Sequence, residues 1–302
     1  MTAGLTTFVG KPNTASQRVP RTRRHRLAAT AVYWLISLLL LLAFLAPFVW
    51  IISSSLKPQA QIFSDVSPLS WKTFLPTSAT LSNYISAFNT EHVGTALINS
   101  VIVSGSQVAL TIVLALPAAY ALTRLRFRGQ GLLFTLIFIT FMVPAEVLIL
   151  PLFQIASDYH LENTLPAVFL PFIASPFALF LLRQAFRDIP RELDEAALID
   201  GAGHTRIMMS VILPNVKPAL ATLALMTFLF SWNAFLWPLV VIQSTSKQLI
   251  QVAIAINTVP GELPNWGPVF AGAVIAVLPV IVLFLFVQRY FIRGFVMSGL
   301  KG

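Results

Sequence analysis

Acid–base chemistry within the apolar parts of this chain would have to use Glu146, because no other acid lies inside a long apolar run of the sequence. His92 and His160 are the available partners, but both fall in polar stretches between the runs, and no paired acid, metal-ligand cluster or nucleophile motif accompanies them. The chain has no cysteine, which excludes disulfides, thiol catalysis and Cys-type metal sites. An intramembrane enzyme is therefore a poor interpretation, and we expect no catalytic or metal site.

Two side chains within apolar runs are better suited to binding a solute than to reacting with it. Glu146 lies between Pro144 and Pro151, which are expected to kink a helix, and a carboxylate inside a membrane is costly unless it is paired or hydrated. Asn233 offers an amide beside the aromatic surface of Trp232, and sugars bind to such pairs of groups. The same residues could instead serve gating or helix packing. They are candidates for a pathway, with both interpretations open.

The elements that must position these residues are long apolar helices. The chain of 302 residues is 57% hydrophobic and 10% charged, with a mean hydropathy of +0.80, a composition that a soluble globule could not cover with polar surface. A helix needs about 20 apolar residues to span the hydrocarbon layer. Six runs satisfy this length: Arg26 to Lys57, Glu91 to Arg124, Gly129 to Ser157, Glu162 to Arg183, Lys217 to Lys247, and Glu262 to Arg289. The sequence predicts an all-α integral membrane protein with six transmembrane helices.

The distribution of basic residues predicts the orientation of these helices. Of the 20 Lys and Arg residues, 17 lie in the termini and the even-numbered loops, whereas Lys57, Lys72 and Lys247 lie on the other side. The positive-inside rule then places both termini in the cytoplasm. The net charge of +9 is thus explained by topology, and a nucleic-acid partner is not expected. We expect a tail at 1–26, a six-helix domain at 27–292 and a tail at 293–302.

The inner loop at 187–217 between the fourth and fifth helices is unusually rich in charge. Its first part predicts a helix with Pro190 near the first turn, acids that favour the positive end of the helix dipole, and Gly201 or Gly203 as its stop. Thr205 is then expected to cap a second helix that ends at Pro214. The loop should therefore be a folded element on the water side of the membrane.

One face of the first predicted helix is small and apolar. Leu193, Ala196, Ala197 and Gly201 follow the spacing of one helix face, so another protein surface could approach it closely. From these residues alone, a solvated connector and a docking site are equally good interpretations. A phosphate-binding loop is a poorer one, because no strand precedes the glycines and the Walker lysine is missing.

The same stretch, EAALIDGAGHTRIMMSVILP, resembles the cytoplasmic signature of ABC importer permeases: Glu-Ala-Ala, Gly four residues later, and Ile-x-Leu-Pro after nine more. Val211 stands where that signature has Ile, a mild departure. Further motifs resemble the maltose-type carbohydrate permeases: SSLKP at 54–58, INS at 98–100, AAYALTRLRFRG at 118–129, MVPAEVLILPLF at 142–153, SWNAFLWPL at 231–239, and the C-terminal QRYFIRGFVMSGLKG. The resemblance covers roughly residues 30–302.

The resemblance implies a permease subunit of a sugar importer in the inner membrane of a bacterial or archaeal cell. Such a subunit works with three kinds of partner: a second, related permease, a dimer of cytoplasmic ATPase subunits and an extracytoplasmic sugar-binding protein. ATP and Mg would bind the ATPase, so this chain would have no cofactor and no enzymatic activity of its own. The inner loop would be the coupling helix, and the chain's C-terminal end would contact the ATPase through Ser298, Lys301 and Gly302. The expected coupling residues are Glu192, Glu195, Ala196, Ala197, Asp200, Gly201 and Pro214.

The solute itself is not determined by the sequence. A sugar importer is the main interpretation, and a glycerol-phosphate or polyol importer of the same family is the alternative. A proton-coupled secondary transporter that uses Glu146 is a more distant possibility, in which the inner loop would be a passive connector.

Overall fold

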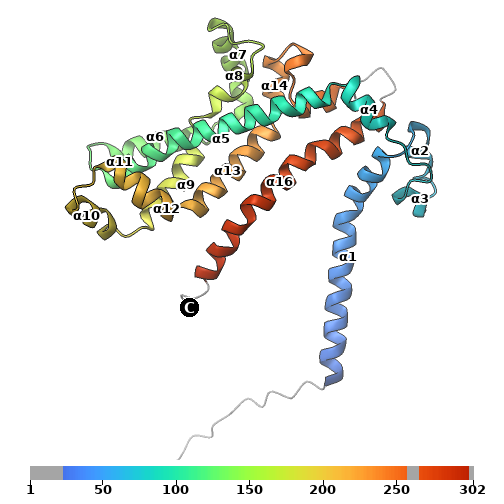
Figure 1. The fold of residues 1–302 in the computed structure, drawn as a ribbon, viewed down its shortest axis with the longest axis horizontal. Coiled ribbons are helices and arrows are strands. Elements are labelled where there is room, and N and C mark those ends of the chain that lie inside the picture. Colours follow the sequence, from blue (N-terminus) through green and yellow to red (C-terminus); the bar gives the residue numbers. More distant parts are fainter. Residues whose placement is uncertain (1–22, 257–264, 299–302) are drawn as a thin grey trace, which may run out of the picture. The chain divides into compact units, whose positions relative to one another are not determined.

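The computed structural model describes residues 23–256 and 265–298, and the side chains of residues 30–256 and 265–290 (Figure 1). The described part of the chain is helical and contains no strand. The α-helices are α1 (Arg23–Ser55), α2 (Gln59–Ser64), α3 (Trp71–Phe74), α4 (Ser82–Asn89), α5 (Val93–Arg124), α6 (Gln130–Thr140), α7 (Ile149–Asp158), α8 (Leu165–Phe169), α9 (Pro176–Arg187), α10 (Glu192–Ile199), α11 (His204–Ile207), α12 (Leu213–Asn215), α13 (Lys217–Trp232), α14 (Leu236–Val241), α15 (Ile250–Ile256) and α16 (Trp266–Ser298). Shorter turns of helix are η1 (Ala145–Leu148), η2 (Leu170–Phe172), η3 (Met208–Ile212) and η4 (Thr245–Lys247).

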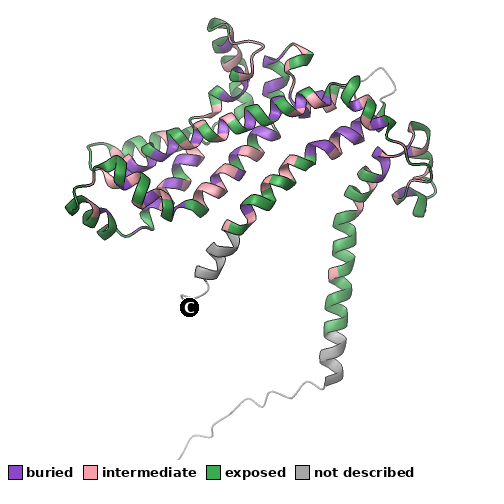
Figure 2. Ribbon diagram, viewed as in Figure 1, coloured by how far each residue is buried: buried purple, intermediate pink, exposed green. Residues whose placement is uncertain are grey.

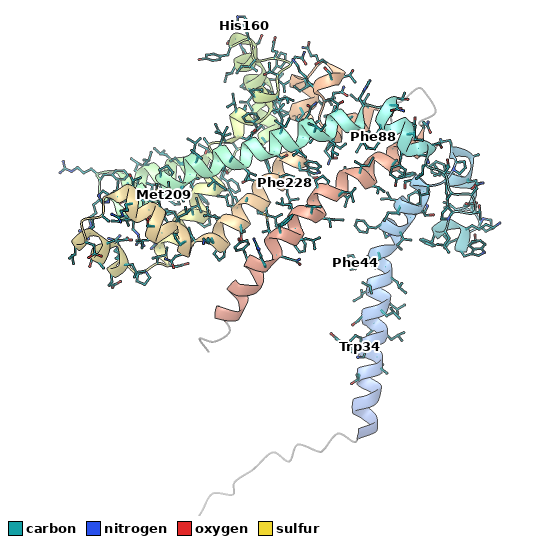
Figure 3. The ribbon with its side chains drawn as sticks, in the orientation of Figure 1. Trp34, Phe44, Phe88, His160, Met209 and Phe228 are labelled. Atoms are coloured by element: carbon teal, nitrogen blue, oxygen red, sulfur yellow. The ribbon has the colours of Figure 1, made fainter. Side chains whose placement is uncertain are left out.

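The chain divides into two compact units, Met1–Val49 and Trp50–Gly302. The apolar part of α1 buries none of its 18-residue window within the chain. Trp34 and Phe44 project from that helix with 67% and 74% of their surface exposed (Figure 3). Such a helix, apolar on every side, is stable only in lipid or against another protein.

Membrane-spanning elements take two forms in the described residues. Three helices are long and apolar enough to cross a bilayer alone: Thr30–Ser55, Val93–Arg124 and Trp266–Tyr290. Three further candidates are pairs of helices with a sharp bend: Gln130–Thr140 with Ala145–Asp158 (86°), Leu165–Phe172 with Pro176–Arg187 (48°), and His204–Asn215 with Lys217–Trp232 (81°). The chain thus has at least three spans by length and composition, and up to six if each bent pair is one span.

The predicted third and fifth helices are not continuous. The third breaks before Pro144, as expected, but Pro151 lies inside the first turn of α7 without interrupting it. The fifth was expected to run from Lys217 to Lys247, which is wrong: α13 ends at Trp232 and the much shorter α14 follows. A backbone that leaves the helix needs other partners for its polar groups, so both breaks are places where the protein lines a cavity or packs tightly.

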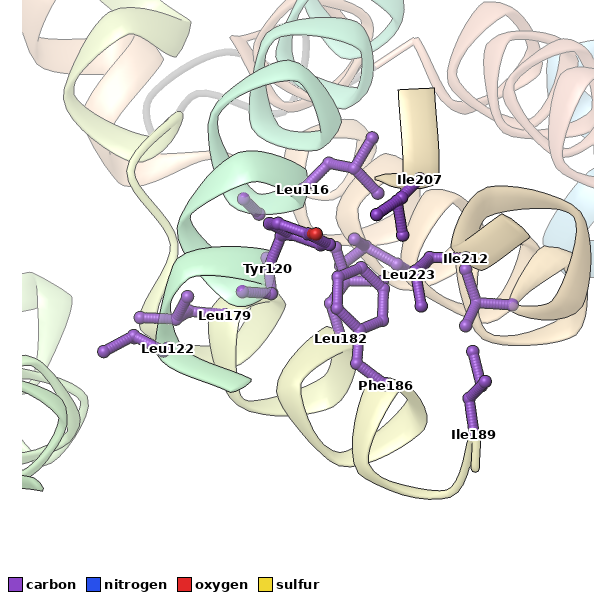
Figure 4. Close-up of a cluster of buried hydrophobic side chains, with 14 residues drawn as sticks. Leu116, Tyr120, Leu122, Leu179, Leu182, Phe186, Ile189, Ile207, Ile212 and Leu223 are labelled. Atoms are coloured by element: carbon purple, nitrogen blue, oxygen red, sulfur yellow. The ribbon is translucent and has the colours of Figure 1, made fainter. Parts of the chain in front are cut away.

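The 32-residue helix α5 organises the packing of the second unit. Residues of α5 belong to all three buried clusters, with α9 and α11–α13 in the first, α4, α13, α15 and α16 in the second, and α7, α8 and α14 in the third. Buried positions (purple in Figure 2) therefore follow α5 along its length. The first cluster (Figure 4) joins Leu116 and Tyr120 of α5 to Leu182 and Phe186 of α9. This cluster is the platform for the inner loop.

Candidate functional site

The inner loop is fastened to the C-terminal end of α5. Arg124, the last residue of α5, places its Nε 2.7 Å from Asp194 Oδ2 of α10, and its Nη2 donates a 2.9 Å hydrogen bond to the carbonyl of Ile189. In the opposite direction, Nη2 of Arg191 donates to the carbonyl of Thr123 at 3.1 Å. Arg124 and Asp194 are almost fully buried, with 6% and 12% of their side chains exposed. The start of α10 is thus fixed to α5 by charge-assisted contacts.

The second half of the loop is held by packing. The Tyr120 hydroxyl lies 3.1 Å from His204 Nδ1, and the two rings meet edge to face. Ile207 and Ile212 are fully buried in the first cluster (Figure 4). Because these contacts come from both α10 and the segment after it, a displacement of the C-terminal end of α5 would move the whole loop, which is the arrangement a mechanical connection needs.

The surroundings of Asp194 shift the pKa of its carboxyl upward. Burial raises the pKa of its carboxyl, whereas the neighbouring guanidinium groups of Arg124 and Arg191 lower it and the Glu195 carboxylate raises it. The net direction is upward, so the cost of removing this carboxylate from water exceeds the gain from its positive neighbours. The ion pair therefore fixes geometry more than it adds stability.

The helix signals in the sequence agree with the structure in part. As predicted, acids occupy the first turn of α10, which begins at Glu192, two residues after Pro190, and Gly201 follows its end with a φ of +79°, a left-handed conformation that favours glycine. Thr205 is not a cap: α11 starts at His204 with Gly203 in the capping position. The following turns also pass through Pro214 rather than ending there, and the chain bends at Val216 instead.

The apolar face predicted for α10 is divided between two sides of the helix. Ala197 packs against the first cluster, whereas Leu193 and Ala196 are exposed. The exposed side of α10 is formed by Glu192, Glu195, Ala196 and Ile199, and Ile199 has 86% of its surface accessible. Helical spacing puts these four residues on one surface, opposite the buried Asp194. That surface combines two acids with an alanine and an isoleucine, and no described residue of the chain covers it.

A cavity of about 620 Å³ lies where the two broken helices approach each other. Glu146, in η1 after the break following α6, and Asn233, directly after α13, both line it. Gln107 of α5 and Ser231 of α13 add two deeply buried polar groups, and the Ser231 hydroxyl has no hydrogen-bond partner. The remaining lining is mostly apolar and aromatic, including Phe172, Phe230 and Trp237. A few polar groups in an apolar hollow of this size are typical of a small-molecule site.

Trp232 does not line the cavity with the other two pathway candidates, Glu146 and Asn233. Its ring is buried in the second cluster and stacks on Phe228, and its Nε1 donates to the carbonyl of Ala276 at 3.1 Å. It does not line the cavity, so its contacts serve the packing of α13 on α16. Trp237 lines the cavity in its place, with its own Nε1 bonded to the carbonyl of Ala167.

The remaining sequence candidates are not gathered into a site. Neither His92 nor His160 lines the cavity that contains Glu146, and His160 lies at the turn that follows α7 (Figure 3). Among the described residues, no group of three or more His, Asp or Glu side chains could hold a metal ion. Lys301 and Gly302 lie outside the described residues, and only the backbone of Ser298 is described, as the last residue of α16.

Sequence reasoning missed a buried ion pair in the segment between α1 and α4. Lys57, within SSLKP, is fully buried, with its Nζ 3.2 Å from Asp65 Oδ2 and hydrogen bonds to the carbonyls of Lys72 and Thr73. Asn83 continues this network by donating to the carbonyls of residues 55 and 57. A lysine next to a proline in a water-exposed stretch reads as a surface charge, and only the contacts within 57–83 reveal its structural role.

Comparison with known proteins identifies the family. One family matches residues 111–296, and it is described as the binding-protein-dependent transport system inner membrane component. The chain belongs to this family. The permease is 37% identical over 274 residues to the arabinooligosaccharides transport system permease protein AraQ of Halalkalibacterium halodurans, covering 89% of this chain and 96% of the relative. It is 34% identical to the trehalose transport system permease protein SugB of Mycobacterium tuberculosis, covering 91% and 99%.

Two further relatives widen the range of solutes named for the family. The sn-glycerol-3-phosphate transport system permease protein UgpE of Yersinia pestis is 36% identical over 211 residues, 70% of this chain and 75% of the relative. Among solved structures, a bacterial ABC transporter involved in the import of the acidic polysaccharide alginate matches with a TM-score of 0.77 and 25% identity, covering 90% of this chain and 99% of that one. The permease fold is therefore shared over nearly the whole chain.

Proposed function

We propose that this permease is a membrane subunit of an ATP-driven carbohydrate importer and that α10 transmits movement to it from a cytoplasmic ATPase. The observation that carries the proposal is the two-sided character of α10. One side is fixed to the end of α5 through Arg124 and Arg191, and the other presents Glu192, Glu195 and Ile199 with no cover. Force applied to the exposed side would reach α5 directly.

The topology belongs to the same proposal. Six spans, with both termini and α10 on the cytoplasmic side, satisfy the positive-inside rule and count each bent helix pair once. A second permease, a pair of ATPase subunits and an extracytoplasmic binding protein would complete the importer. ATP and Mg would be bound by the ATPase, and the C-terminal residues Ser298, Lys301 and Gly302 would add a second contact with it.

The cavity is this subunit's share of the pathway in our proposal. Its amide and hydroxyl groups at Gln107, Ser231 and Asn233 suit the hydroxyls of a sugar, and its rings suit the apolar faces of one. The one ionisable lining residue is the acid Glu146, which would repel a phosphate ester. The cavity therefore favours a neutral carbohydrate over glycerol phosphate, whereas a polyol shares the sugar's chemistry. Dependence on a binding protein, expected from the family, disfavours a proton-coupled secondary transporter.

A charge reversal on α10 and a bulky substitution just after it test the coupling role. Glu195→Lys and Gly201→Trp are expected to reduce uptake by the reconstituted importer at least tenfold, about 1.4 kcal/mol of lost coupling, while the permease remains in the membrane. Asp158→Lys, an exposed reversal at the end of α7, is the matched control and should leave uptake normal. Normal uptake in both α10 variants would overturn the assignment.

A second experiment addresses the cavity. Gln107→Leu and Asn233→Leu are expected to raise the KM for sugar uptake, because each removes a polar group that a bound sugar could use. Trp232→Phe is the control, since Trp232 lies outside the cavity and should affect stability without changing solute preference. An unchanged KM in both cavity variants would remove the cavity from the pathway.

A further inference from the structure

The helix α9, which packs against α6, has two arginines with no acidic ion-pair partner among the described residues. Arg183 and Arg187 are four residues apart on α9, so they lie on the same face of the helix. The ion pairs of the described residues join Lys57 to Asp65 and Arg124 to Asp194, and include neither arginine. The Arg183 Nε is buried and has no hydrogen-bond partner. Asp188, the neighbouring acid, forms no ion pair with either side chain.

Ring contacts fix how α6 lies against α9. The Arg183 guanidinium lies over the Phe134 ring at 4.0 Å, Phe138 meets Phe180 at 5.4 Å, and Phe141 stacks on Phe177 at 6.4 Å. Residue numbers rise on α6 as they fall on α9, so the helices are antiparallel. Continuing this register by one turn places the first residues of α6 beside Arg187.

The N-terminus of α6 adds to the positive field at this end. The helix has 11 residues, and its capping position is Gly129, which has no side chain to accept a hydrogen bond from the first N–H groups. Arg126 and Arg128 are exposed in the short loop just before it. Arg187 also borders an open hollow of about 570 Å³, which Arg124 and Arg191 line together with the acids Asp188 and Glu192. The basic side chains at this end of the two helices outnumber these two acids, so a compact anion would meet a net positive field.

The surface that leads away from the arginines is apolar. Leu133, Leu136 and Phe138 of α6 and Phe180 of α9 each have between 38% and 55% of their surface exposed. None of them is covered by another part of the chain. A free phosphate would have no use for this surface, whereas acyl chains would lie along it.

We propose that Arg183 and Arg187, at the cytoplasmic end of the contact between α6 and α9, bind the phosphate headgroup of an anionic phospholipid, with the acyl chains lying against α6. Basic pockets between transmembrane helices on the cytoplasmic side are suited to such headgroups. The side of the membrane rests on the proposed topology, but the lipid contact does not depend on the coupling role of α10. The bound lipid would fix the bent pair α6–α7 against α9 at one end.

Lipid retention by the intact importer tests this site without measuring transport. The purified complex is mixed with phosphatidylglycerol or phosphatidylethanolamine in detergent and analysed by native mass spectrometry. Retention of phosphatidylglycerol should exceed that of phosphatidylethanolamine. Arg183→Gln with Arg187→Gln should weaken retention of phosphatidylglycerol by about thirtyfold, which is roughly fivefold for each basic residue. Arg206→Gln, which removes an exposed arginine from α11, is the matched control and should retain the lipid.

Two further measurements separate the remaining outcomes. Replacing both arginines by lysine keeps the charge, so phosphatidylglycerol retention should return, which distinguishes a lost site from a misfolded protein. Inorganic phosphate should not displace the lipid at equal concentration, and equal competition would mean that the site takes a soluble anion instead. Equal retention of both lipids, or unchanged retention in the glutamine variant, would overturn the proposal.

Discussion

Replacing Arg124 by methionine should loosen α10 much more than replacing Asp194 by asparagine, although the two side chains form one ion pair. Opposite charges about 4 Å apart attract by about 4 kcal/mol at the effective dielectric of a protein. Removing each ion from water costs several kcal/mol, and the raised pKa of Asp194 indicates that this cost dominates for the acid. The two partners are therefore not equivalent.

The difference can be estimated from the contacts. Arg124→Met leaves the Asp194 carboxylate, 12% exposed, without its nearest positive charge, and it also removes the hydrogen bond to the carbonyl of Ile189. Breaking a buried pair in this way costs about 3 kcal/mol. Asp194→Asn keeps an acceptor for Arg124 and removes the buried negative charge, so its cost should be about 1 kcal/mol or less. The double variant should recover most of the loss.

Hydrogen exchange of the α10 amides in the assembled importer measures this difference. Local opening should become about a hundredfold more frequent in Arg124→Met and about fivefold in Asp194→Asn, since 1.4 kcal/mol corresponds to a factor of about ten. Equal acceleration in the two single variants, or additive losses in the double variant, would refute the reasoning. Exchange in α15, which contacts neither residue, serves as the internal reference.

The pH dependence of the same opening has a defined sign. Because the folded pKa of Asp194 lies above its ordinary value, the folded loop binds this proton more tightly than the open loop does. The stabilisation that the protonated Asp194 carboxyl gives the folded loop is fully present below the ordinary carboxyl pKa. It is lost as the pH rises through the raised pKa of the folded loop. Arg124→Met raises the pKa further and extends this loss to higher pH. Asp194→Asn should abolish this contribution, which exchange rates measured between pH 4 and pH 7 would reveal.

Two other substitutions have matched controls within the chain. Gly201→Ala should cost about 1 kcal/mol in the stability of the loop because φ is +79° there, whereas Gly203→Ala, at φ −75° with open space around it, should be nearly neutral; exchange of the α10 amides compares them. Lys57→Met should lower the thermal stability of the permease because it leaves Asp65 without its ion-pair partner, whereas Lys72→Met, at an exposed position, should not.

The local features of α10 were accessible from sequence because their causes are local. Acids in a first turn, and a glycine at a left-handed position, act within a few residues, so the limits of α10 followed from its own residues. Which side of α10 is buried could not be predicted from these residues. Asp194 faces inward because its partner Arg124 is 70 positions earlier in the chain, and a single sequence offers no sign of that pairing. Ala197 therefore packs inward with it while Ala196 stays exposed.

The breaks in the membrane helices show a second limit. Pro144 predicts the break in the third membrane helix, and the structure has a break at that position. Asn233 and its neighbours contain neither proline nor glycine, yet α13 stops at Trp232, whose indole donates to the Ala276 carbonyl of α16. Hydropathy continues through the break and predicts one helix. Tertiary contacts decide the matter, and with it the place of Asn233 on the cavity wall.

The length of α5 gives its two ends a mechanical relationship. Near its N-terminal end, the Asn99 amide donates to the carbonyls of Ser246 and Gln248, and at its C-terminal end Arg124 holds α10. About 25 residues of continuous helix separate these anchors, or roughly 37 Å at 1.5 Å per residue. A tilt of about 10° about one anchor would then displace the other by about 6 Å. Under the proposed coupling role of α10, the helix would work as a lever arm, so that no chain of side-chain rearrangements would be needed between its two ends.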